Sequence, residues 1–451
     1  MTLDAFKDIL FDRAKKEGFS EYEIYYVDGE NFKISVYEKE IDQYSVNTKI
    51  GLSFRGLYHG KMGYAYTEIL DNEAIELLIK NAKANAMAIE NEDIEVIYGE
   101  KDTYAEVKGY NEALETVSVD EKIELALALE KNVHEQSDKV KGVEYCLVQS
   151  SKNSRRIINS KGLDVQYKSN GIAAVLIPII QDGEKMITGE AFKVTNIFEE
   201  INPQQLAKEA VADALAYIGA EAVESGNYPI ALRNDVAADL LATFSGIFSA
   251  DNVQKGLSLL KGKMGKQIGS SKLTILDDPL LKNGICSTPF DDEGVATYTK
   301  TVVEKGRLHT FLYNLKTAMK DGVKTTGNAS KSSYASPVDI APTNFYIQPG
   351  EKSFEQLLKN LDDGILITQL QGMHSGTNAV TGDFSLAAKG FLVKKGKIKR
   401  PIEQITVSGN FFKVLENIEQ VGADLKFGMP TGQGCFGSPT LLITQLSIAG
   451  K

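Results

Sequence analysis

Gln371-Gly-Met-His374-Ser375-Gly-Thr-Asn378-Ala-Val-Thr381-Gly-Asp383-Phe-Ser385 is a glycine-spaced polar stretch that directly follows an apolar, strand-like run, Ile365 to Leu370. Its glycines permit turns with positive φ. Five side chains offer donors and acceptors that no neighbouring strand ladder needs: His374, Ser375, Asn378, Thr381 and Asp383. Polar, turn-rich loops after strands often form binding surfaces, so we predict that these five residues bind substrate. The alternative is a loop whose Asx and Ser/Thr turns bond only to themselves.

Further motifs lie on both sides of this loop. They are Gly51-Leu-Ser-Phe-Arg55-Gly, Arg156-Ile-Ile-Asn159-Ser160-Lys-Gly162, Phe290-Asp-Asp-Glu293-Gly294, Gly306-Arg307-Leu-His309-Thr-Phe-Leu312, Ile405-Thr-Val-Ser-Gly409-Asn410 and Gly434-Cys435-Phe-Gly-Ser438-Pro439. With the loop, they resemble the TldD/PmbA family of peptide-processing proteins. The PmbA (TldE) branch carries G-x-H-S-G-T-N-x-x-T-G-D-F-S, which the 371–385 stretch matches. The resemblance spans most of the chain, and that stretch is its specific part.

The zinc motif of the family's catalytic branch is missing. The TldD branch carries H-E-x-x-x-H on a helix, where imidazoles can hold Zn²⁺ and the glutamate can activate water. At the equivalent place this chain reads Asn234-Asp235-Val-Ala-Ala-Asp239, and no His or Glu occurs from Asn227 to Asn252. The apolar residues from Val236 to Phe248 still follow a helical period. We therefore predict that the helix is kept while its metal ligands are lost.

What the resemblance implies is a PmbA/TldE-like, non-catalytic subunit of a cytosolic metalloprotease. No cofactor or metal is expected in this chain, and zinc is expected in a TldD-like partner subunit. The pair would degrade unfolded peptides and mature peptide precursors by trimming leader segments. The chain would act as a homodimer or in a hetero-oligomer, and would be inactive alone.

The residues themselves leave three alternatives open, two for the function and one for a metal site. A regulatory or scaffold homodimer without protease activity would fit the family's older description as a modulator of DNA gyrase. A stand-alone hydrolase could use His374, Ser375 and Asp383, although adjacent residues of an extended segment are poorly placed to bond each other. Cys435 is interpreted as a buried structural thiol, and the alternative is a metal site built from His374 and Cys435.

Composition restricts the location and the partners. Lys plus Arg number 50 against 61 for Asp plus Glu, which gives a net charge of -11. This acidity opposes attraction to phosphate backbones, so we expect no direct nucleic-acid binding. No secretory signal opens the chain, and the longest apolar run, Gly171 to Ile180, is half of the roughly 20 residues that span a bilayer. We expect a cytoplasmic protein with no membrane contact.

Three cysteines, Cys146, Cys286 and Cys435, are too few to predict a disulfide framework.

The helix and strand patterns predict an α+β fold in three blocks. Residues 1–100 combine an opening helix, alternating strands and a helix after Asp71. Residues 115–222 repeat the helix, strands, helix order, with a capping box at Ser118 to Glu121 and a proline-led helix at Pro203. Residues 226–451 form a β-rich C-terminal domain with short helices at 311–320 and 353–361. The segment 324–337 is poor in apolar residues and is expected to be a mobile loop.

Overall fold

The computed structural model describes residues 1–451 except 91, 92 and 101. Its N-terminal half is built on one antiparallel sheet with the strand order β3-β2-β1-β4-β5-β6, in which β7 also pairs with β5. The strands are β1 (Glu21–Tyr37), β2 (Glu40–Tyr58), β3 (Lys61–Thr67), β4 (Val140–Asn159), β5 (Asp164–Asp182), β6 (Lys185–Thr188) and β7 (Ala191–Thr195). Since β1 pairs with both β2 and β4, the first two blocks of the chain share this sheet.

The central strands are longer than the sequence pattern indicates. Two separate apolar runs in residues 23–37 belong to the single strand β1, which is 17 residues long. Its polar middle, around Asp28 and Glu30, does not end the strand because β2 and β4 run alongside it and pair with its backbone. At about 3.3 Å per residue, β4 with its 20 residues extends for roughly 65 Å.

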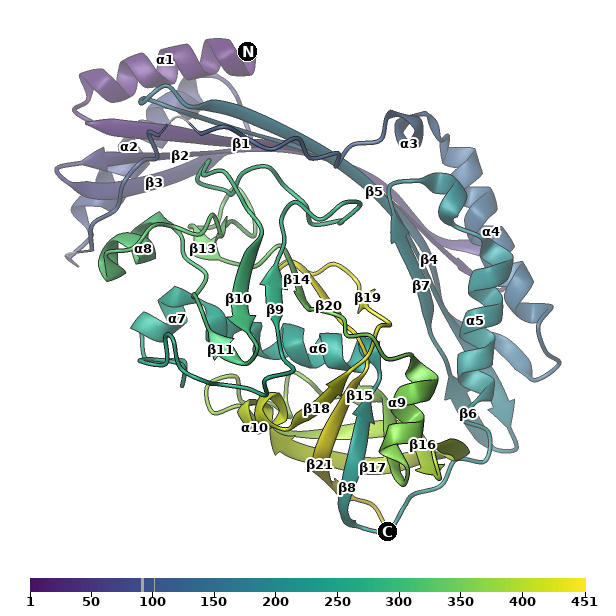
Figure 1. Ribbon diagram of the computed structural model, residues 1–451. Coiled ribbons are helices and arrows are strands. Elements are labelled where there is room, and N and C mark those ends of the chain that lie inside the picture. The colour runs from purple at the N-terminus through teal and green to yellow at the C-terminus, as the bar shows by residue number, and fades with distance from the viewer. Residues whose placement is uncertain (91–92, 101) are drawn as a thin grey trace.

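Helices cover one face of the sheet at its two ends (Figure 1). At one end α1 (Leu3–Lys16) and α2 (Asn72–Met87) enclose a core that includes Phe6, Leu78 and Phe54. At the other end α4 (Val119–His134) and α5 (Pro203–Leu215) enclose Ile34 and other residues of the central strands, and the short α3 (Glu112–Thr116) precedes α4. The predicted helix starts are confirmed: Asp71 caps α2, Ser118 and Glu121 form a capping box, and Pro203 opens α5.

The third block lies against the opposite face of the sheet and contains two further sheets. One has the order β11-β10-β9-β14-β20-β19 and the other β17-β16-β15-β8-β21-β18. Pairing between β17 and β21 closes β17, β16, β15, β8 and β21 into a ring. The strands are β8 (Gly226–Leu232), β9 (Ile275–Asp277), β10 (Lys300–Glu304), β11 (Arg307–Leu308), β14 (Asn344–Ile347), β15 (Gly364–Gln371), β16 (Asp383–Lys394), β17 (Lys397–Asn410), β18 (Ile418–Val421), β19 (Lys426–Phe427), β20 (Cys435–Ser438) and β21 (Leu441–Ala449).

Short helices and a two-stranded ladder complete this block. They are α6 (Asn234–Phe244), α7 (Ala250–Gln254), α8 (Leu315–Asp321), α9 (Phe354–Leu361) and α10 (Phe411–Glu416), with β12 (Ala329–Ser330) paired to β13 (Asp339–Ile340). The α+β class, with helix-flanked antiparallel strands followed by a β-rich part, is thus confirmed. None of the helices in the described residues is both long and apolar enough to cross a membrane.

Two segments of the third block differ from their sequence patterns. The helix predicted over 311–320 begins only at Leu315, because Asn314 forms a capping box with Thr317 while Phe311 to Tyr313 are buried in extended backbone. The segment 324–337 is packed between the third block and the N-terminal sheet. Its few apolar residues suffice because polar groups bond it on both sides, as when Tyr64 of β3 donates to the Tyr334 carbonyl.

Candidate functional site

The loop 371–385 is held in shape by three of the five predicted binding residues. The Asn378 side-chain oxygen accepts the backbone N–H groups of Val380 at 3.0 Å and Thr381 at 3.1 Å. Asp383 accepts from the Asn410 amide at 2.9 Å and from the Thr381 hydroxyl at 2.8 Å. These two hydrogen bonds lower the pKa of Asp383, because they favour its ionised form. Asn378, Thr381 and Asp383 therefore serve the geometry of the loop itself.

His374 and Ser375 lie exposed in the same loop. The Ser375 hydroxyl donates only to the Gly372 carbonyl, at 3.4 Å, and the His374 imidazole forms no hydrogen bond with the described residues. Their neighbour Met373 accepts a hydrogen bond from Thr243, which places the loop beside the C-terminal end of α6. The His374 ring is thus free to contact a ligand or a partner protein.

The geometry of a nucleophilic relay is absent from this loop. Within the described chain, no hydrogen bond joins any two of His374, Ser375 and Asp383. A relay needs the nucleophile within hydrogen-bond reach of the base, and the base oriented by a third group. The stand-alone hydrolase therefore has no assembled catalytic centre here.

Helix α6 is retained, and Asn234 and Asp235 at its start are engaged in other contacts. The Asn234 amide donates to the Asp424 carbonyl at 2.9 Å, and Asp235 forms an ion pair with Arg233 at 2.7 Å. Desolvation, followed by the charges of Asp235 and Glu190, raises the pKa of Asp239 to about 6. This set lacks the imidazole and thiolate groups that zinc prefers.

Among the residues that the structure describes, no group of three or more His, Cys, Asp or Glu side chains is arranged to hold a metal ion. That this chain holds no metal stays a prediction.

Cys435 is not a free thiol. It forms a disulfide with Cys286, with the two Cα atoms 5.8 Å apart. The interpretation of Cys435 as a buried structural thiol is therefore wrong, and the alternative site with His374 loses its thiolate ligand. No local pattern predicts this bond, since 149 residues separate the two cysteines. The free cysteine is Cys146, which is buried.

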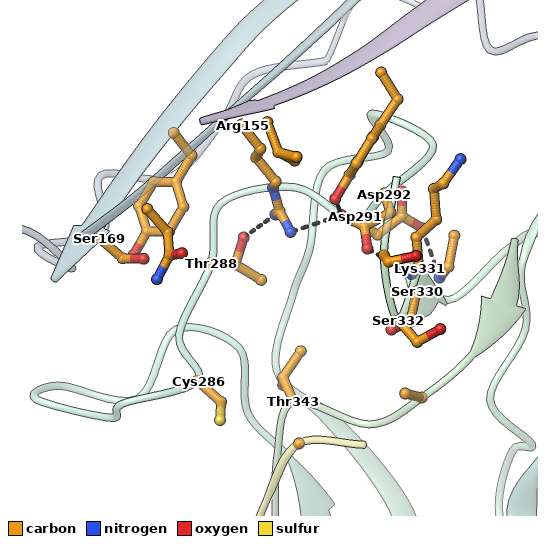
Figure 2. Close-up of a pocket in the computed structure, with 18 of the residues that line it drawn as sticks. Arg155, Ser169, Cys286, Thr288, Asp291, Asp292, Ser330, Lys331, Ser332 and Thr343 are labelled. Carbon is orange, nitrogen blue, oxygen red and sulfur yellow. Dashed lines mark hydrogen bonds and ion pairs between the residues drawn. The ribbon is translucent and has the colours of Figure 1, made fainter. Parts of the chain in front are cut away.

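A cavity of about 390 Å³ lies where the middle of the N-terminal sheet faces the third block (Figure 2). Strands β1, β4 and β5 contribute Tyr25, Arg155 and Ser169 to its wall. The third block contributes a polar floor that includes Thr288, Asp291, Asp292, Ser330, Lys331, Ser332 and Thr343. A second cavity has a volume of about 640 Å³. The two cavities adjoin, because both are lined by Ser332, Ala341, Pro342 and Gln433. None of the five predicted binding residues lines either of these two cavities.

Asp292 joins the sheet to the cavity floor. Arg155 donates to Asp292 Oδ1 at 2.7 Å and also to the Thr288 hydroxyl and the Phe290 carbonyl. The Tyr25 hydroxyl donates to the same oxygen at 3.2 Å, and the backbone N–H of Lys331 donates to Oδ2 at 2.7 Å. The Asp292 carboxylate therefore holds together Arg155 of β4, Tyr25 of β1 and the backbone of Lys331.

The neighbouring Asp291 holds the floor of the cavity together. Its carboxylate accepts backbone N–H groups from Glu293 at 2.9 Å, Val295 at 3.0 Å and Ala329 at 3.0 Å. Burial, and then the charge of Glu293, raises the pKa of Asp291 to about 8, while the three backbone donors act in the opposite direction.

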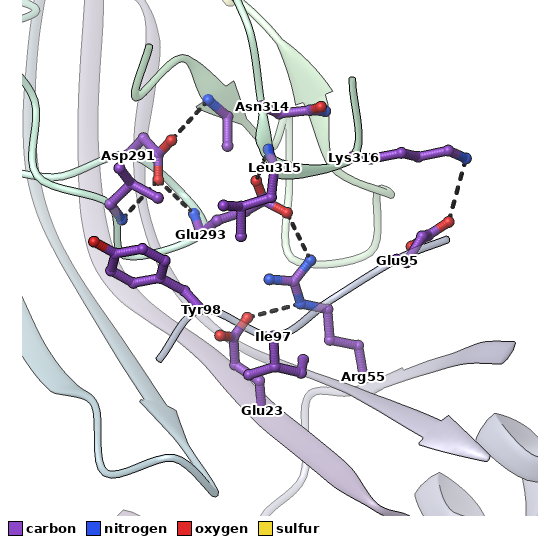
Figure 3. A network of polar contacts seen from close by, with 12 residues as sticks. Glu23, Arg55, Glu95, Ile97, Tyr98, Asp291, Glu293, Asn314, Leu315 and Lys316 are labelled. Carbon is purple, nitrogen blue, oxygen red and sulfur yellow. Dashed lines mark hydrogen bonds and ion pairs between the residues drawn. The ribbon is translucent and has the colours of Figure 1, made fainter. Parts of the chain in front are cut away.

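Glu293 carries a second connection to the sheet (Figure 3). Arg55 of β2 donates to Glu23 at 2.8 Å and to Glu293 at 3.1 Å, and the other Glu293 oxygen accepts the backbone N–H of Leu315 at 2.8 Å. All three charged side chains are buried. Arg55 and Glu293 stand in two of the family motifs, Gly51 to Gly56 and Phe290 to Gly294, but nothing in the spacing of these motifs indicated that they meet.

The family comparisons cover most of the chain. The sequence models of the PmbA/TldA metallopeptidase family match in three parts: domain 1 at residues 22–86, the central domain at 112–217 and the C-terminal domain at 225–450. The last of these alone spans half of the chain.

Individual relatives agree with these matches. An uncharacterised protein of Methanocaldococcus jannaschii is 33% identical over 429 residues, covering 91% of this chain and 94% of its own length. The metalloprotease PmbA of Escherichia coli O157:H7 is 29% identical over 74% of this chain and 71% of its own length.

Solved structures show the same fold. A candidate modulator of a DNA gyrase from Thermotoga maritima superimposes with a TM-score of 0.91 at 36% identity, over 99% of this chain and all of that one. TldE from Thermococcus kodakarensis superimposes with a TM-score of 0.90 at 23% identity, over the same shares of the two chains. The protein therefore belongs to the PmbA/TldD metallopeptidase family.

Proposed function

We propose that this chain is a PmbA/TldE-like, non-catalytic subunit of a cytosolic metalloprotease, which works with a zinc-bearing TldD-like subunit. The observation that carries the proposal is helix α6. A chain of a metallopeptidase family keeps this helix, yet Asn234, Asp235 and Asp239 stand where the catalytic branch has H-E-x-x-x-H. The substrates would be unfolded peptides and the leader segments of peptide precursors.

The chain would contribute binding surfaces, and its partner would contribute the chemistry. Zn²⁺ in the partner would polarise the peptide carbonyl and activate water. An extended peptide can be held without sequence preference by pairing with a free strand edge. The exposed His374 and Ser375 would contact the peptide or the partner, while Asn378, Thr381 and Asp383 keep the loop in the conformation that presents them.

The wider setting follows the same proposal. The chain would work in the cytoplasm, as a homodimer or in a hetero-oligomer with the zinc-bearing subunit, without a membrane and without direct contact to nucleic acid. A net charge of -11 supports the last point.

A second candidate is regulation of a partner protein without proteolysis. The Thermotoga maritima structure, described as a candidate modulator of a DNA gyrase, favours it because that chain is 36% identical over nearly the whole length. Such a regulator would act on the protein partner, since a net charge of -11 opposes binding to DNA.

Activity assays separate these functions. The purified chain alone should not cleave an unfolded peptide, and cleavage should appear when a TldD-like subunit carrying H-E-x-x-x-H is added. A chelator should abolish that cleavage. Cleavage by this chain alone that resists chelation would favour a stand-alone hydrolase, and no cleavage by the mixed subunits would favour the regulator.

Metal content provides an independent readout. The isolated chain, purified without chelator, should contain far less than one zinc per chain in elemental analysis. Introducing only His and Glu into α6, as Asn234→His, Asp235→Glu and Asp239→His, should not create activity, because a third ligand and the groups that orient the ligands are still missing. One zinc per wild-type chain would overturn the metal-free assignment.

A further inference from the structure

The disulfide between Cys286 and Cys435 lies between two cavities. Cys286 lines the cavity of about 390 Å³ (Figure 2), and Cys435 lines a third cavity, of about 370 Å³. Ile285, the residue before Cys286, lines both of these cavities. The S–S bond and its neighbour therefore belong to the wall that the two cavities share.

The two cysteines differ in burial and in the support of their backbone. Cys435 is 3% exposed in strand β20, where its backbone N–H donates to the Thr343 carbonyl at 2.8 Å. Cys286 is partly exposed and lies in the loop 278–287, which follows β9. An external reagent therefore reaches the sulfur of Cys286 more readily than the sulfur of Cys435.

Hydrogen bonds hold the base of this loop independently of the disulfide. The Asn344 side chain donates to the Asp278 carbonyl at 2.8 Å and to the Ser287 hydroxyl at 2.9 Å. Its oxygen accepts the backbone N–H of Cys286 at 3.3 Å. The base of the loop thus keeps a support when the S–S bond is broken.

The tip of the loop, residues 282–285, has less support. Lys282 and Asn283 are exposed, and neither side chain forms a hydrogen bond or an ion pair with the described residues. The backbone of the tip forms hydrogen bonds within its own turn, as from Gly284 to the Leu281 carbonyl at 2.9 Å. The adjacent disulfide is what ties this turn to β20, so breaking it would lower the cost of local opening.

We propose that this disulfide is a thiol–disulfide exchange site for low-molecular-weight thiols, attacked at Cys286, and that its reduction releases the 282–285 tip from the wall between the two cavities. The proposal rests on the cytoplasmic location in the proposed function. Disulfides of cytosolic proteins are usually transient or redox-sensing, because the cytosol keeps thiols reduced. The bond is therefore a reversible link in this setting.

The exchange balances in two steps. An external thiolate attacks Cys286 Sγ, forms a mixed disulfide with it and expels the Cys435 thiolate, which takes up a proton. A second thiolate attacks the external sulfur of the mixed disulfide and expels the Cys286 thiolate, which is protonated in turn. The two external thiols leave as their own disulfide, and the two electrons that they lose reduce the protein. An excess of the external disulfide reverses both steps.

Exchange is measured on the full-length oxidised protein in buffers of reduced and oxidised glutathione. After an acid quench, unfolding and alkylation, mass spectrometry should find all three cysteines alkylated in excess reduced glutathione, and Cys146 alone in excess oxidised glutathione. Cys146 is the internal control, because it is a buried free thiol in both states. A disulfide that stays intact in a large excess of reduced glutathione would overturn the exchange site.

Two single variants test where the attack occurs. With oxidised glutathione, Cys435→Ser should form a mixed disulfide at Cys286. Cys286→Ser should form one at Cys435 about tenfold more slowly or less, because exchange depends on access to the sulfur. Equal rates in the two variants would overturn the attack at Cys286.

Limited digestion by trypsin measures the release of the tip. Cleavage after Lys282 should be about tenfold faster or more in the reduced protein, and in Cys286→Ser with Cys435→Ser, than in the oxidised wild type, because cleavage follows local opening. Cleavage after the exposed Lys272, in the turn before β9, is the matched control and should be equal in all three. Reduction without faster cleavage after Lys282 would contradict the release.

These measurements use neither a peptide substrate nor a partner subunit. Exchange with faster cleavage after Lys282 would support the inference even if the mixed subunits degrade no peptide. Peptide degradation by the mixed subunits together with an inert disulfide would overturn the inference and leave the proposed proteolytic function intact.

Discussion

At the scale of single residues, Lys331 shows how the surroundings set the chemistry of a side chain. Its amino group donates to the Ser53 hydroxyl at 2.9 Å and the Tyr64 hydroxyl at 3.0 Å, and it lies over the rings of Tyr25 and Tyr64. It forms no ion pair with a carboxylate of the described chain. Burial, and then the charge of Arg55, lowers the pKa of Lys331 from 10.5 to about 7. The fold therefore favours the neutral amine at this position.

The shifted pKa of Lys331 predicts a pH dependence of stability. Between pH 7 and pH 10 the unfolded chain binds a proton at this lysine that the folded chain does not, so the free energy of unfolding rises with pH. The contribution approaches about 1.4 kcal/mol per pH unit, the value for one proton. Lys331→Met should remove this rise, as measured by urea unfolding at several pH values. The exposed Lys272→Met is the control, and parallel curves for the wild type and Lys331→Met would refute the assignment.

At the scale of elements, the loop 371–385 divides its polar residues between two tasks. Asn378 forms an Asx turn, and Asp383 connects the loop to Asn410 at the end of β17. His374 bonds to none of the described residues, and the loop lies beside the helix that carries zinc ligands in the catalytic branch. The loop thus holds its own shape and leaves the imidazole available.

This division predicts different outcomes for two substitutions. His374→Ala should change the free energy of unfolding by less than about 0.5 kcal/mol, as is usual for exposed loop residues, and should weaken peptide capture or pairing with the zinc-bearing subunit. Asn378→Ala should cost about 1 kcal/mol, because two backbone N–H groups lose their acceptor. Urea unfolding and a binding assay measure the two effects.

The control for this comparison is His134→Ala, which changes an exposed histidine at the end of α4. It should alter neither stability nor binding by much. If His374→Ala unfolds several kcal/mol more easily while binding per folded molecule is unchanged, the loop is structural and the site assignment is wrong.

At the scale of the whole molecule, buried charges join the N-terminal sheet to the third block. Arg55 connects Glu23 of the sheet to Glu293 of the third block, and Arg155 connects the sheet to Asp292. Of these residues, Arg155 and Asp292 line the cavity of about 390 Å³. These ion pairs add to the apolar contacts of Tyr25 and Ile157 with Phe290 and Tyr334, which also join the two halves.

Arg55→Ala should cost about 3–5 kcal/mol of unfolding free energy, because it leaves the charges of Glu23 and Glu293 buried without a partner. Arg156→Ala is the matched control on the same sheet, where the pairs with Asp4 and Asp164 are partly exposed and worth less than about 1 kcal/mol each. If Arg55→Ala and Arg156→Ala lower the free energy of unfolding equally in denaturant, the buried network stabilises the protein no more than the exposed pairs do. Combining Arg55→Met with Glu23→Gln and Glu293→Gln should recover part of the loss, since no buried charge remains.

Local signals in the sequence determined several structural features of this protein. The capped helices, the α+β class and the helix without zinc ligands depend on neighbours a few residues apart, and the structure has the predicted helix starts at Asp71, Ser118 and Pro203. The 371–385 motif likewise identified the family, because its residues are contiguous. Periodicity and capping are properties of one segment, so the sequence of that segment is enough to predict them.

Only the tertiary structure decided which distant segments meet. Arg55 and Glu293 are 238 residues apart, and Cys286 and Cys435 are 149 residues apart. The polar middle of β1 remains a strand because β2 and β4 pair with it, and the cavity exists because the third block packs against that sheet. Such contacts depend on strand pairing and burial across the whole chain, which no local pattern of residues encodes.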